Sequence, residues 1–240
     1  ISGIKIKPSL DDPNKEEIEF YLNSEFYNSG INYPYEQLSI SDPAIMRDLR
    51  VAAVTFVPFK YNDAKGILQV IKKANIRVEF SEQEKGLNEK IAERSVSGVF
   101  NSIYKQAVLN YAETSNRSES QKSILYIIKD HPTMINALNN LVTWRRQMGY
   151  LVTVATTSQT GNTNSSIKTY IQNAYDNWDN PPDYVVLVGD MNGSYAIPTW
   201  TISYYSAIGD HPYALLDGND QIEDVFLGRI SYESLTELIT

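Results

Sequence analysis

The chain of 240 residues contains no cysteine. This absence excludes disulfide bonds, thiolate metal sites and a cysteine nucleophile within these residues. Histidine is scarce, with only His131 and His211, and no Gly-x-Ser-x-Gly elbow, Walker-type loop or His-Glu-x-x-His pair is present. Neither histidine has a nucleophile to activate, so we interpret both as turn or surface residues. No apolar run reaches the roughly 18 residues that a membrane span needs.

Basic residues are almost missing from the C-terminal quarter of the chain. From Asp183 onward there are nine carboxylates and a single base, Arg229, and this segment carries the whole net charge of −8. A nucleic-acid partner is not expected, because phosphate binding requires a basic face. A bound cation fits this charge distribution better.

Helical periodicity is absent from most of residues 1–117. Clusters of Pro, Asn, Gly and Asp separate short alternating runs, a pattern that predicts an all-β sandwich or a barrel-like domain. One helix is expected within Ala92–Tyr111. A polar, Ser-rich linker follows at Glu113–Gln121, in which the bond after Arg117 is either an ordinary solvated position or a processing site. The alternating runs are Ile4–Lys7, Ile18–Leu22, Val51–Pro58, Ile67–Ile71 and Ile76–Phe80.

Strands and helices alternate in residues 118–240, which predicts an α/β/α, Rossmann-like subdomain. Asp130 is expected to cap a first helix that Gly149 ends, Ser165 or Ser166 to start a second, and Ser231 to cap a third. The chain ends inside the third helical pattern and begins without Met, so we expect an incomplete domain from a longer, processed protein. The expected strands are Ser123–Ile128, Leu151–Ala155, Tyr184–Val188 and Val225–Ile230.

The loop Ser158–Thr163 imitates the loop that holds the FMN phosphate in flavodoxins, where hydroxyls and a helix N-terminus surround the anion. An ordinary polar loop is the alternative. This loop follows the second strand of the subdomain, whereas a flavodoxin has it after the first. A flavodoxin-like FMN-binding electron carrier is therefore a secondary hypothesis.

Six carboxylates lie between the expected strands Tyr184–Val188 and Val225–Ile230. In an extended Asp220–Asp224 segment the period of two points Asp220 and Asp224 to the same side, where both can hold one cation. Asp190, just after the strand, would help to complete the six to eight oxygens that calcium prefers. A solvated acidic loop is the alternative. The six are Asp190, Asp210, Asp217, Asp220, Glu223 and Asp224.

Several blocks of the sequence resemble the gingipain-type cysteine peptidases. Ser41–Val51 is similar to their pro-region, and later blocks are similar, in the same order, to the first subdomain of their catalytic domain. The later blocks are Val186–Asp190, Ile197-Pro198, Asp210–Tyr213, Gly218–Asp220 and Val225–Ser234.

The resemblance implies a β-rich pro-region at 1–117 and a truncated, caspase-like first catalytic subdomain at 118–240. It also implies a secreted or cell-surface bacterial zymogen, whose pro-region holds it latent and binds the remainder of its own catalytic domain. The parent enzyme would cleave protein or peptide substrates through a Cys–His dyad and an acyl-enzyme. Neither the family's Gly-His-Gly nor its cysteine occurs here, so the dyad is expected beyond residue 240. No catalytic residue is assigned, and this chain alone is expected to be inactive.

The resemblance further implies a structural Ca²⁺ site and favours processing near Arg117. Arg47 or Arg50 could enter the substrate cleft, but a structural salt bridge is the favoured role for either. A third hypothesis is a non-catalytic, secreted adhesion or sorting module that reuses a peptidase scaffold. The implied calcium ligands are Asp190, the Asp217 carbonyl, Asp220, the Ile222 carbonyl and Asp224.

Overall fold

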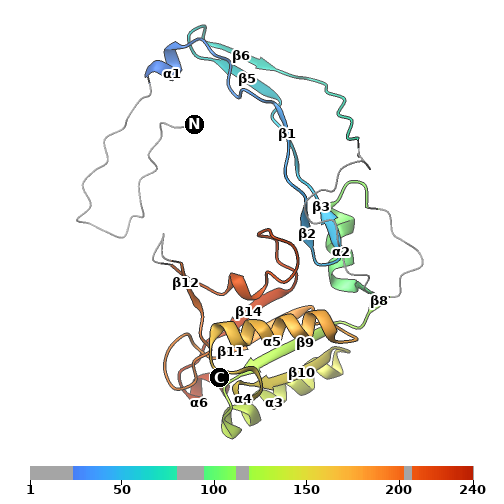
Figure 1. Ribbon diagram of the computed structural model, residues 1–240, viewed down its shortest axis with the longest axis vertical. Coiled ribbons are helices and arrows are strands. Elements are labelled where there is room, and N and C mark those ends of the chain that lie inside the picture. The colour runs from blue at the N-terminus through green and yellow to red at the C-terminus, as the bar shows by residue number, and fades with distance from the viewer. Residues whose placement is uncertain (1–23, 80–94, 112–118, 203–206, 240) are drawn as a thin grey trace, which may run out of the picture. The chain divides into compact units, whose positions relative to one another are not determined.

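The computed structural model describes residues 24–79, 95–111, 119–202 and 207–239 (Figure 1). The chain divides into two compact units. Unit 1 comprises Ile1–Asp42 and Ala52–Glu84, and unit 2 comprises Pro43–Val51 and Lys85–Thr240. The short segment 43–51 is thus part of unit 2, although its neighbours on both sides in the sequence belong to unit 1.

Unit 1 is built from short antiparallel pairs. Strand β1 pairs with β4, and β5 pairs with β6. Two expected runs, Val51–Pro58 and Ile67–Ile71, contain strands, whereas residues 76–79 form none and Ile4–Lys7 and Ile18–Leu22 lie outside the described residues. The described residues of this unit form two-stranded sheets only, and they do not make the expected sandwich or barrel. The elements are α1 (Ser24–Asn28), β1 (Leu38–Ile40), β4 (Val54–Phe56), β5 (Phe59–Asn62) and β6 (Ile67–Val70).

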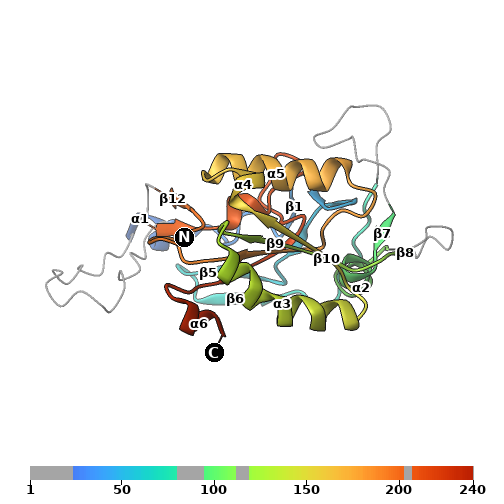
Figure 2. The same cartoon turned by 90° about the horizontal axis from the view of Figure 1, so that it is seen from below.

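Unit 2 contains a parallel sheet of four strands in the order β10-β9-β11-β14. Helices α5 and α3 lie on opposite faces of this sheet (Figure 2), which gives the expected three-layer α/β/α arrangement. The strands are β9 (Ser123–Ile128), β10 (Leu151–Thr156), β11 (Tyr184–Val188) and β14 (Phe226–Ile230). The helices are α3 (Pro132–Gln147), α4 (Thr157–Thr160), α5 (Asn164–Asn177) and α6 (Leu235–Ile239).

Continuous apolar runs form the two inner strands, as the sequence predicts. All six residues of β9 are buried, because this strand has neighbours on both edges and helices on both faces. Ile167 and Ile171 of α5 pack on one face of the sheet, and Met134 and Leu138 of α3 pack on the other. Two apolar clusters therefore hold the layers together.

The helix starts differ from the expectations. His131, not Asp130, is the N-cap residue of α3, and the Asp130 carboxylate accepts a hydrogen bond from Ser158. Helix α5 starts at Asn164, one to two residues earlier than expected, and the Thr163 hydroxyl caps it by accepting from the Ser166 N–H. Helix α6 begins at Leu235, so Ser231 does not cap it. At α3, the hydrogen bond from Ser158 engages the Asp130 carboxylate, which could otherwise cap the helix.

The remaining elements of unit 2 are short, apart from α2, which matches the helix expected within residues 92–111. Strand β8, in the final part of the expected linker, pairs in parallel with β7, whereas Arg117 lies outside the described residues. In the part of the chain that the structure describes, no helix is long and apolar enough to cross a bilayer. The elements are β2 (Ala44–Met46), β3 (Leu49–Val51), β7 (Val96–Ser97), α2 (Gly98–Ala107), β8 (Glu119–Ser120), β12 (Trp200–Ile202), β13 (Ala207–Gly209) and the 3₁₀ turn η1 (His211–Tyr213).

Candidate functional site

A β-hairpin inserts an arginine into the interior of unit 2. Strands β2 and β3 pair from Ala44 opposite Val51 to Met46 opposite Leu49, and we call residues 44–51 the anchor hairpin. Arg47 lies in its turn with φ +58°, a left-handed conformation that costs a residue with a side chain roughly 1–2 kcal/mol. The contacts of Arg47 must offset this cost.

Main-chain carbonyls and one carboxylate surround the Arg47 guanidinium, which is almost fully buried. It donates hydrogen bonds to the carbonyl oxygens of Pro182 at 2.9 Å, Asp224 at 3.0 Å and Pro181 at 3.3 Å. Its charge pairs with the Asp183 carboxylate at 3.3 Å. The fixed fork of an arginine suits several planar acceptors at once, which a lysine could not match. The favoured structural salt bridge is therefore confirmed for Arg47.

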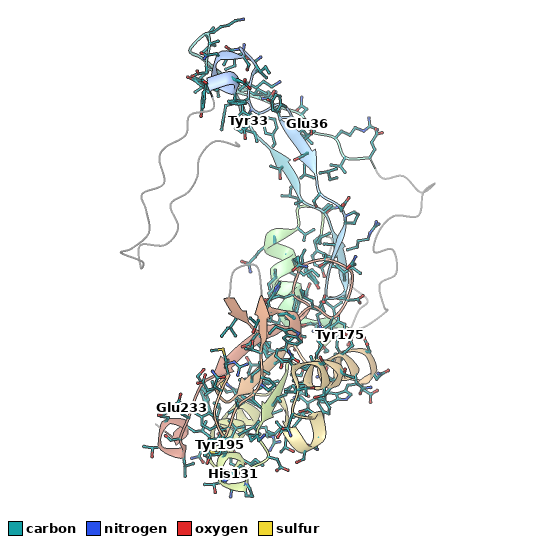
Figure 3. The ribbon with its side chains drawn as sticks, turned by 60° about the vertical axis from the view of Figure 1, so that its left-hand side comes forward. Tyr33, Glu36, His131, Tyr175, Tyr195 and Glu233 are labelled. Atoms are coloured by element: carbon teal, nitrogen blue, oxygen red, sulfur yellow. The ribbon has the colours of Figure 1, made fainter. Side chains whose placement is uncertain are left out.

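Aromatic rings from two helices complete the surroundings of Arg47. We call the carbonyls of Pro181, Pro182 and Asp224, the Asp183 carboxylate and these two rings the arginine cage. The Arg47 guanidinium carbon lies 5.1 Å from the centroid of Phe100, on α2, and 5.6 Å from that of Tyr175, on α5. The Tyr175 hydroxyl also donates to the Arg47 carbonyl at 2.8 Å (Tyr175 is labelled in Figure 3). Cation–π contacts gain strength when the cation is removed from water, as it is here.

Asp183 connects the anchor hairpin to the start of the sheet. Its side chain is fully buried and accepts hydrogen bonds from the Ser97 hydroxyl at 2.5 Å and from the Ser123 main-chain N–H at 3.0 Å. Together with the Arg47 ion pair, these contacts join β7, β9 and the hairpin at one carboxylate. Loss of either charged partner would leave the other charge buried and unpaired, which typically costs about 3–5 kcal/mol.

A second tyrosine holds the hairpin turn. The Tyr104 hydroxyl, on α2, lies 2.7 Å from the Met46 carbonyl oxygen and 2.5 Å from Oδ1 of Asp48. Burial and the neighbouring Asp48 carboxylate raise the pKa of Tyr104, so the hydroxyl keeps its proton and acts as a donor. The turn is thus fixed from both sides, by Tyr104 at Met46 and by Tyr175 at Arg47.

Two of the carboxylates expected to bind calcium accept hydrogen bonds from the anchor hairpin. The Ile45 N–H donates to Oδ2 of Asp220 at 2.8 Å, and the Arg47 N–H donates to Oδ1 of Asp224 at 2.8 Å. Gly218 permits this approach, because its φ is +73° and a Cβ there would lie 2.5 Å from Oδ2 of Asp220. The acidic loop, which comprises residues 217–224, is therefore shaped to receive the edge of the anchor hairpin.

The remaining oxygens of these carboxylates are also used. Oδ2 of Asp224 accepts from the N–H groups of Leu216 and Asp217, each at 2.7 Å, and Oδ1 of Asp220 accepts from the Ile222 N–H at 2.9 Å. Burial raises the pKa of Asp224 to about 6. The hydrogen bonds from the main-chain N–H groups of Asp217, Leu216 and Arg47 lower this pKa but do not outweigh burial. Across the described residues, no three His, Asp or Glu side chains are arranged to hold a metal ion. With the hairpin bound, the donor set does not fit a calcium shell, and the five-residue site stays a prediction.

Asp190, the expected calcium ligand after β11, is held by a different network. Its carbonyl accepts from the Ile197 N–H at 2.8 Å and lies 3.3 Å from the Arg229 guanidinium. Arg229 makes a fork onto Asp210, at 2.8 and 2.7 Å. Gly189, at φ +147°, allows the loop to close, since a Cβ there would lie 2.2 Å from the Tyr195 carbonyl oxygen. Arg229 thus fixes the chain that leaves the sheet edge.

The two histidines have structural surroundings, in line with their interpretation as turn residues. His131 occupies the N-cap position of α3 without a side-chain capping bond and meets Tyr195 edge to face at 5.4 Å. Both lie with Glu233 at one end of unit 2 (Figure 3). His211 opens η1 and lies 3.8 Å from the exposed Glu223 carboxylate. Neither geometry forms a nucleophile–base pair.

The loop that imitates a flavodoxin phosphate loop binds its own neighbours. Residues Thr157–Thr160 form α4, and the Ser158 hydroxyl donates to Asp130. The Thr163 hydroxyl is engaged with Ser166 at the start of α5. Two of the hydroxyls that would hold a phosphate thus have protein partners.

Comparisons with known proteins place both halves of the chain in one family. Residues 117–240 match peptidase family C25, and residues 6–118 match the C25 propeptide. The chain belongs to peptidase family C25. The anchor hairpin and α2 thus fall in the C25 propeptide, whereas Asp183, Asp220 and Asp224 fall in the C25 peptidase region. No finding favours the flavin or the adhesion hypothesis for this C25 chain.

Curated C25 relatives from Porphyromonas gingivalis cover nearly all of the chain. Gingipain R2 (strain ATCC 33277) is 27% identical over 226 residues, which are 92% of this chain and 30% of the relative. Gingipain R1 is 27% identical over 237 residues, which are 96% of this chain and 22% of the relative. Lys-gingipain (strain ATCC 33277) is 26% identical over 245 aligned residues, which cover 97% of this chain and 14% of the relative. The chain therefore spans less than a third of the length of these relatives.

Two solved structures of a relative also match. The crystal structure of the Arg-specific cysteine proteinase gingipain R (RgpB) is 25% identical, covers 53% of this chain and 28% of that chain, and has a TM-score of 0.44. The complex of the P. gingivalis RgpB pro- and mature domains is 27% identical, covers 49% of this chain and 27% of that chain, and has a TM-score of 0.44.

Sequence reasoning missed several residues of the arginine cage. Asp183 directly precedes β11 and enters the sequence analysis only as the first residue of the acidic segment, and no local signal marks Ser97, Tyr104 or Tyr175 as site residues. Their partners lie between 56 and 128 positions away, so no local pattern reports the contacts. The available signals were an arginine in the pro-region motif and the Pro-Pro-Asp sequence before β11.

Proposed function

We propose that this chain is the pro-region and first catalytic subdomain of a gingipain-like cysteine endopeptidase precursor, in which the pro-region holds the enzyme latent. The arginine cage carries the proposal. Arg47 lies in the C25 propeptide, while Pro181, Pro182, Asp183 and Asp224 lie in the C25 peptidase region. A buried, fully ligated arginine is a strong connection between a pro-region and the enzyme part it covers.

The chain contributes binding and positioning to this precursor and supplies no reacting group. It has no cysteine, so the nucleophile of the proposed acyl-enzyme mechanism, with its histidine, would come from beyond residue 240. The proposed setting is secreted or at a bacterial cell surface, with protein or peptide substrates and with the remainder of the catalytic domain as the pro-region's partner. A complex of pro- and mature domains exists for RgpB, which supports this association by likeness.

The test compares full-length precursors in a peptidase assay before and after removal of the pro-region. The unprocessed precursor should be nearly inactive, and Arg47→Ala should raise its activity at least about tenfold, since each 1.4 kcal/mol of lost pro-region binding is a factor of ten. Arg77→Ala, in the exposed ion pair with Glu79 at 3.0 Å, is the matched control and should stay latent.

A Cys→Ala change at the downstream nucleophile should abolish activity in the processed enzyme. Activity that survives this change would refute the cysteine-peptidase mechanism. An Arg47→Ala precursor as latent as the Arg77→Ala control would instead refute the role of the arginine cage in latency.

A further inference from the structure

The oxygens that hold the Arg47 guanidinium are fixed by contacts outside the anchor hairpin. The Asp183 carboxylate accepts from the Ser123 N–H at 3.0 Å, and the Pro181 carbonyl accepts from the Ser123 hydroxyl at 2.7 Å. The Asp183 carbonyl accepts from the Phe226 N–H at 2.8 Å, which joins the chain just before β11 to the start of β14. The parallel sheet therefore positions these oxygens, whether or not an arginine lies among them.

Without Arg47, the arginine cage would present its acceptors to no cation. Asp183 is fully buried, so its negative charge would lie unpaired in a medium of low polarity, which is strongly unfavourable. A guanidinium is planar and carries its donors in a fixed fork, so it can meet this carboxylate and the carbonyls of Pro181, Pro182 and Asp224 together. An ammonium group is a compact point charge and cannot make these contacts at once. The cage is therefore selective for a guanidinium group.

The acidic loop adds contacts to the main chain around the arginine. Oδ2 of Asp220 accepts the N–H group of Ile45, and Oδ1 of Asp224 accepts the N–H group of Arg47, each at 2.8 Å. The loop thus recognises the main chain at the arginine and two residues before it, while the cage recognises the side chain. An arginine within a peptide can use both sets of contacts. The net charge of −8 from Asp183 onward also favours a cationic ligand.

We propose that the arginine cage is a binding site for arginyl peptides, which the anchor hairpin fills in the precursor and which an arginine of another chain fills once the hairpin has left. The cage holds the arginine and cleaves nothing, since it contains no nucleophile–base pair. An arginyl ligand binds only the hairpin-free state, so by mass action it also favours release of the hairpin. The inference rests on the proposed function for the precursor and its release alone.

The first test uses the 240-residue chain with Arg47→Gly and ethylguanidinium, a mimic of the arginine side chain. Glycine is chosen because φ at this position is +58°, which glycine adopts without strain. In isothermal titration, Arg47→Gly should bind ethylguanidinium at least about tenfold more tightly than the wild type, whose own arginine fills the cage. Ethylammonium, which lacks the planar fork, should bind Arg47→Gly at least about tenfold more weakly than ethylguanidinium.

Two further variants separate binding in the cage from binding elsewhere. Asp183→Asn, added to Arg47→Gly, keeps the shape of the cage but removes its charge, and should weaken ethylguanidinium binding at least about tenfold. Arg77→Gly removes an arginine from the exposed pair with Glu79 and should match the wild type. Equal affinity of the wild type and folded Arg47→Gly, or of Arg47→Gly with and without Asp183→Asn, would each overturn the proposal.

The wild-type chain gives a second test, which does not depend on the folding of any variant. Hydrogen exchange at the amides of Ile45 and Arg47 reports opening of the hairpin. N-acetylarginine amide should accelerate this exchange about twofold at a concentration equal to its Kd for the cage, because it binds only the open state. N-acetyllysine amide at equal concentration should leave the exchange unchanged. Equal effects of the two amides would refute the proposal. A failure of latency would appear only in the peptidase assay of the full-length precursor, so the two proposals can fail separately.

Discussion

Two short hairpins of this chain have opposite surroundings. The anchor hairpin buries Ile45 to 1% exposure and seats Arg47 inside unit 2, whereas the β5–β6 hairpin leaves Ile67, Leu68 and Val70 between 48% and 60% exposed. Both are antiparallel pairs of three- or four-residue strands rich in apolar residues. The local pattern is therefore the same, and distant residues decide which hairpin is buried.

Two arginine ion pairs show the same contrast. Arg47 lies 3.3 Å from Asp183, with side chains 4% and 1% exposed, and Arg77 lies 3.0 Å from Glu79, with side chains 86% and 72% exposed. The distances are similar, but water screens the second pair and does not reach the first. Distance alone therefore says little about the energy of an ion pair, and burial decides it.

The largest effect is expected from Arg47→Ala. The substitution leaves Asp183 buried without its charged partner and removes three hydrogen bonds to carbonyl oxygens, so the free energy of unfolding should fall by about 3–5 kcal/mol. Arg77→Ala should change it by less than about 0.5 kcal/mol. Urea unfolding followed by tryptophan fluorescence reports on unit 2, which contains all three tryptophans, and far-UV circular dichroism reports on the whole chain. Equal effects of the two substitutions would contradict the comparison.

A smaller effect is expected from removing one hydroxyl from each hairpin environment. Tyr104→Phe deletes the buried hydroxyl that lies between the Met46 carbonyl and the Asp48 carboxylate and should cost about 1–3 kcal/mol, since these acceptors lose a partner away from water. Tyr61→Phe deletes the exposed hydrogen bond to Asp63 at 2.9 Å and should leave stability unchanged within error. The same unfolding measurement applies. A loss for Tyr61→Phe as large as that for Tyr104→Phe would show that the β5–β6 hairpin has a partner of its own.

The sequence predicts the parallel sheet well because the signal is local. Each inner strand is a continuous apolar run, and Ser123–Ile128 and Tyr184–Val188 match β9 and β11 to the residue. The end of α3 also follows, since Gly149 has the left-handed conformation expected after a helix. The helix starts were less predictable, because Asp130, Thr163 and their neighbours offer several equivalent caps.

The candidate site was less accessible from the sequence. Periodicity places Asp220 and Asp224 on one side of the chain, and both do face a single partner. That partner is a hairpin more than 170 residues away, which no local rule identifies. The sequence favours a salt bridge for Arg47, and Asp183 is that partner, but its other acceptors are three main-chain carbonyls, which carry no sequence signature.

The smallest effect concerns the ion pair between Arg229 and Asp210, whose exposure of 11% and 22% lies between the other two pairs. Burial opposes ionisation of Asp210, but hydrogen bonds from Arg229 and Thr199 and the Arg229 charge outweigh it and lower the pKa of Asp210. A carboxyl with a pKa below its unfolded value of about 3.9 adds stability above that pH and loses it as the pH falls through the folded-state pKa. Unfolding free energies measured from pH 5 to pH 2 should therefore fall more steeply for the wild type than for Asp210→Asn. If the unfolding free energies of the two proteins fall in parallel with pH, an ion pair of intermediate exposure adds as little stability as the exposed Arg77–Glu79 pair. Only full burial, as for Arg47 and Asp183, would then make an ion pair of this chain strongly stabilising.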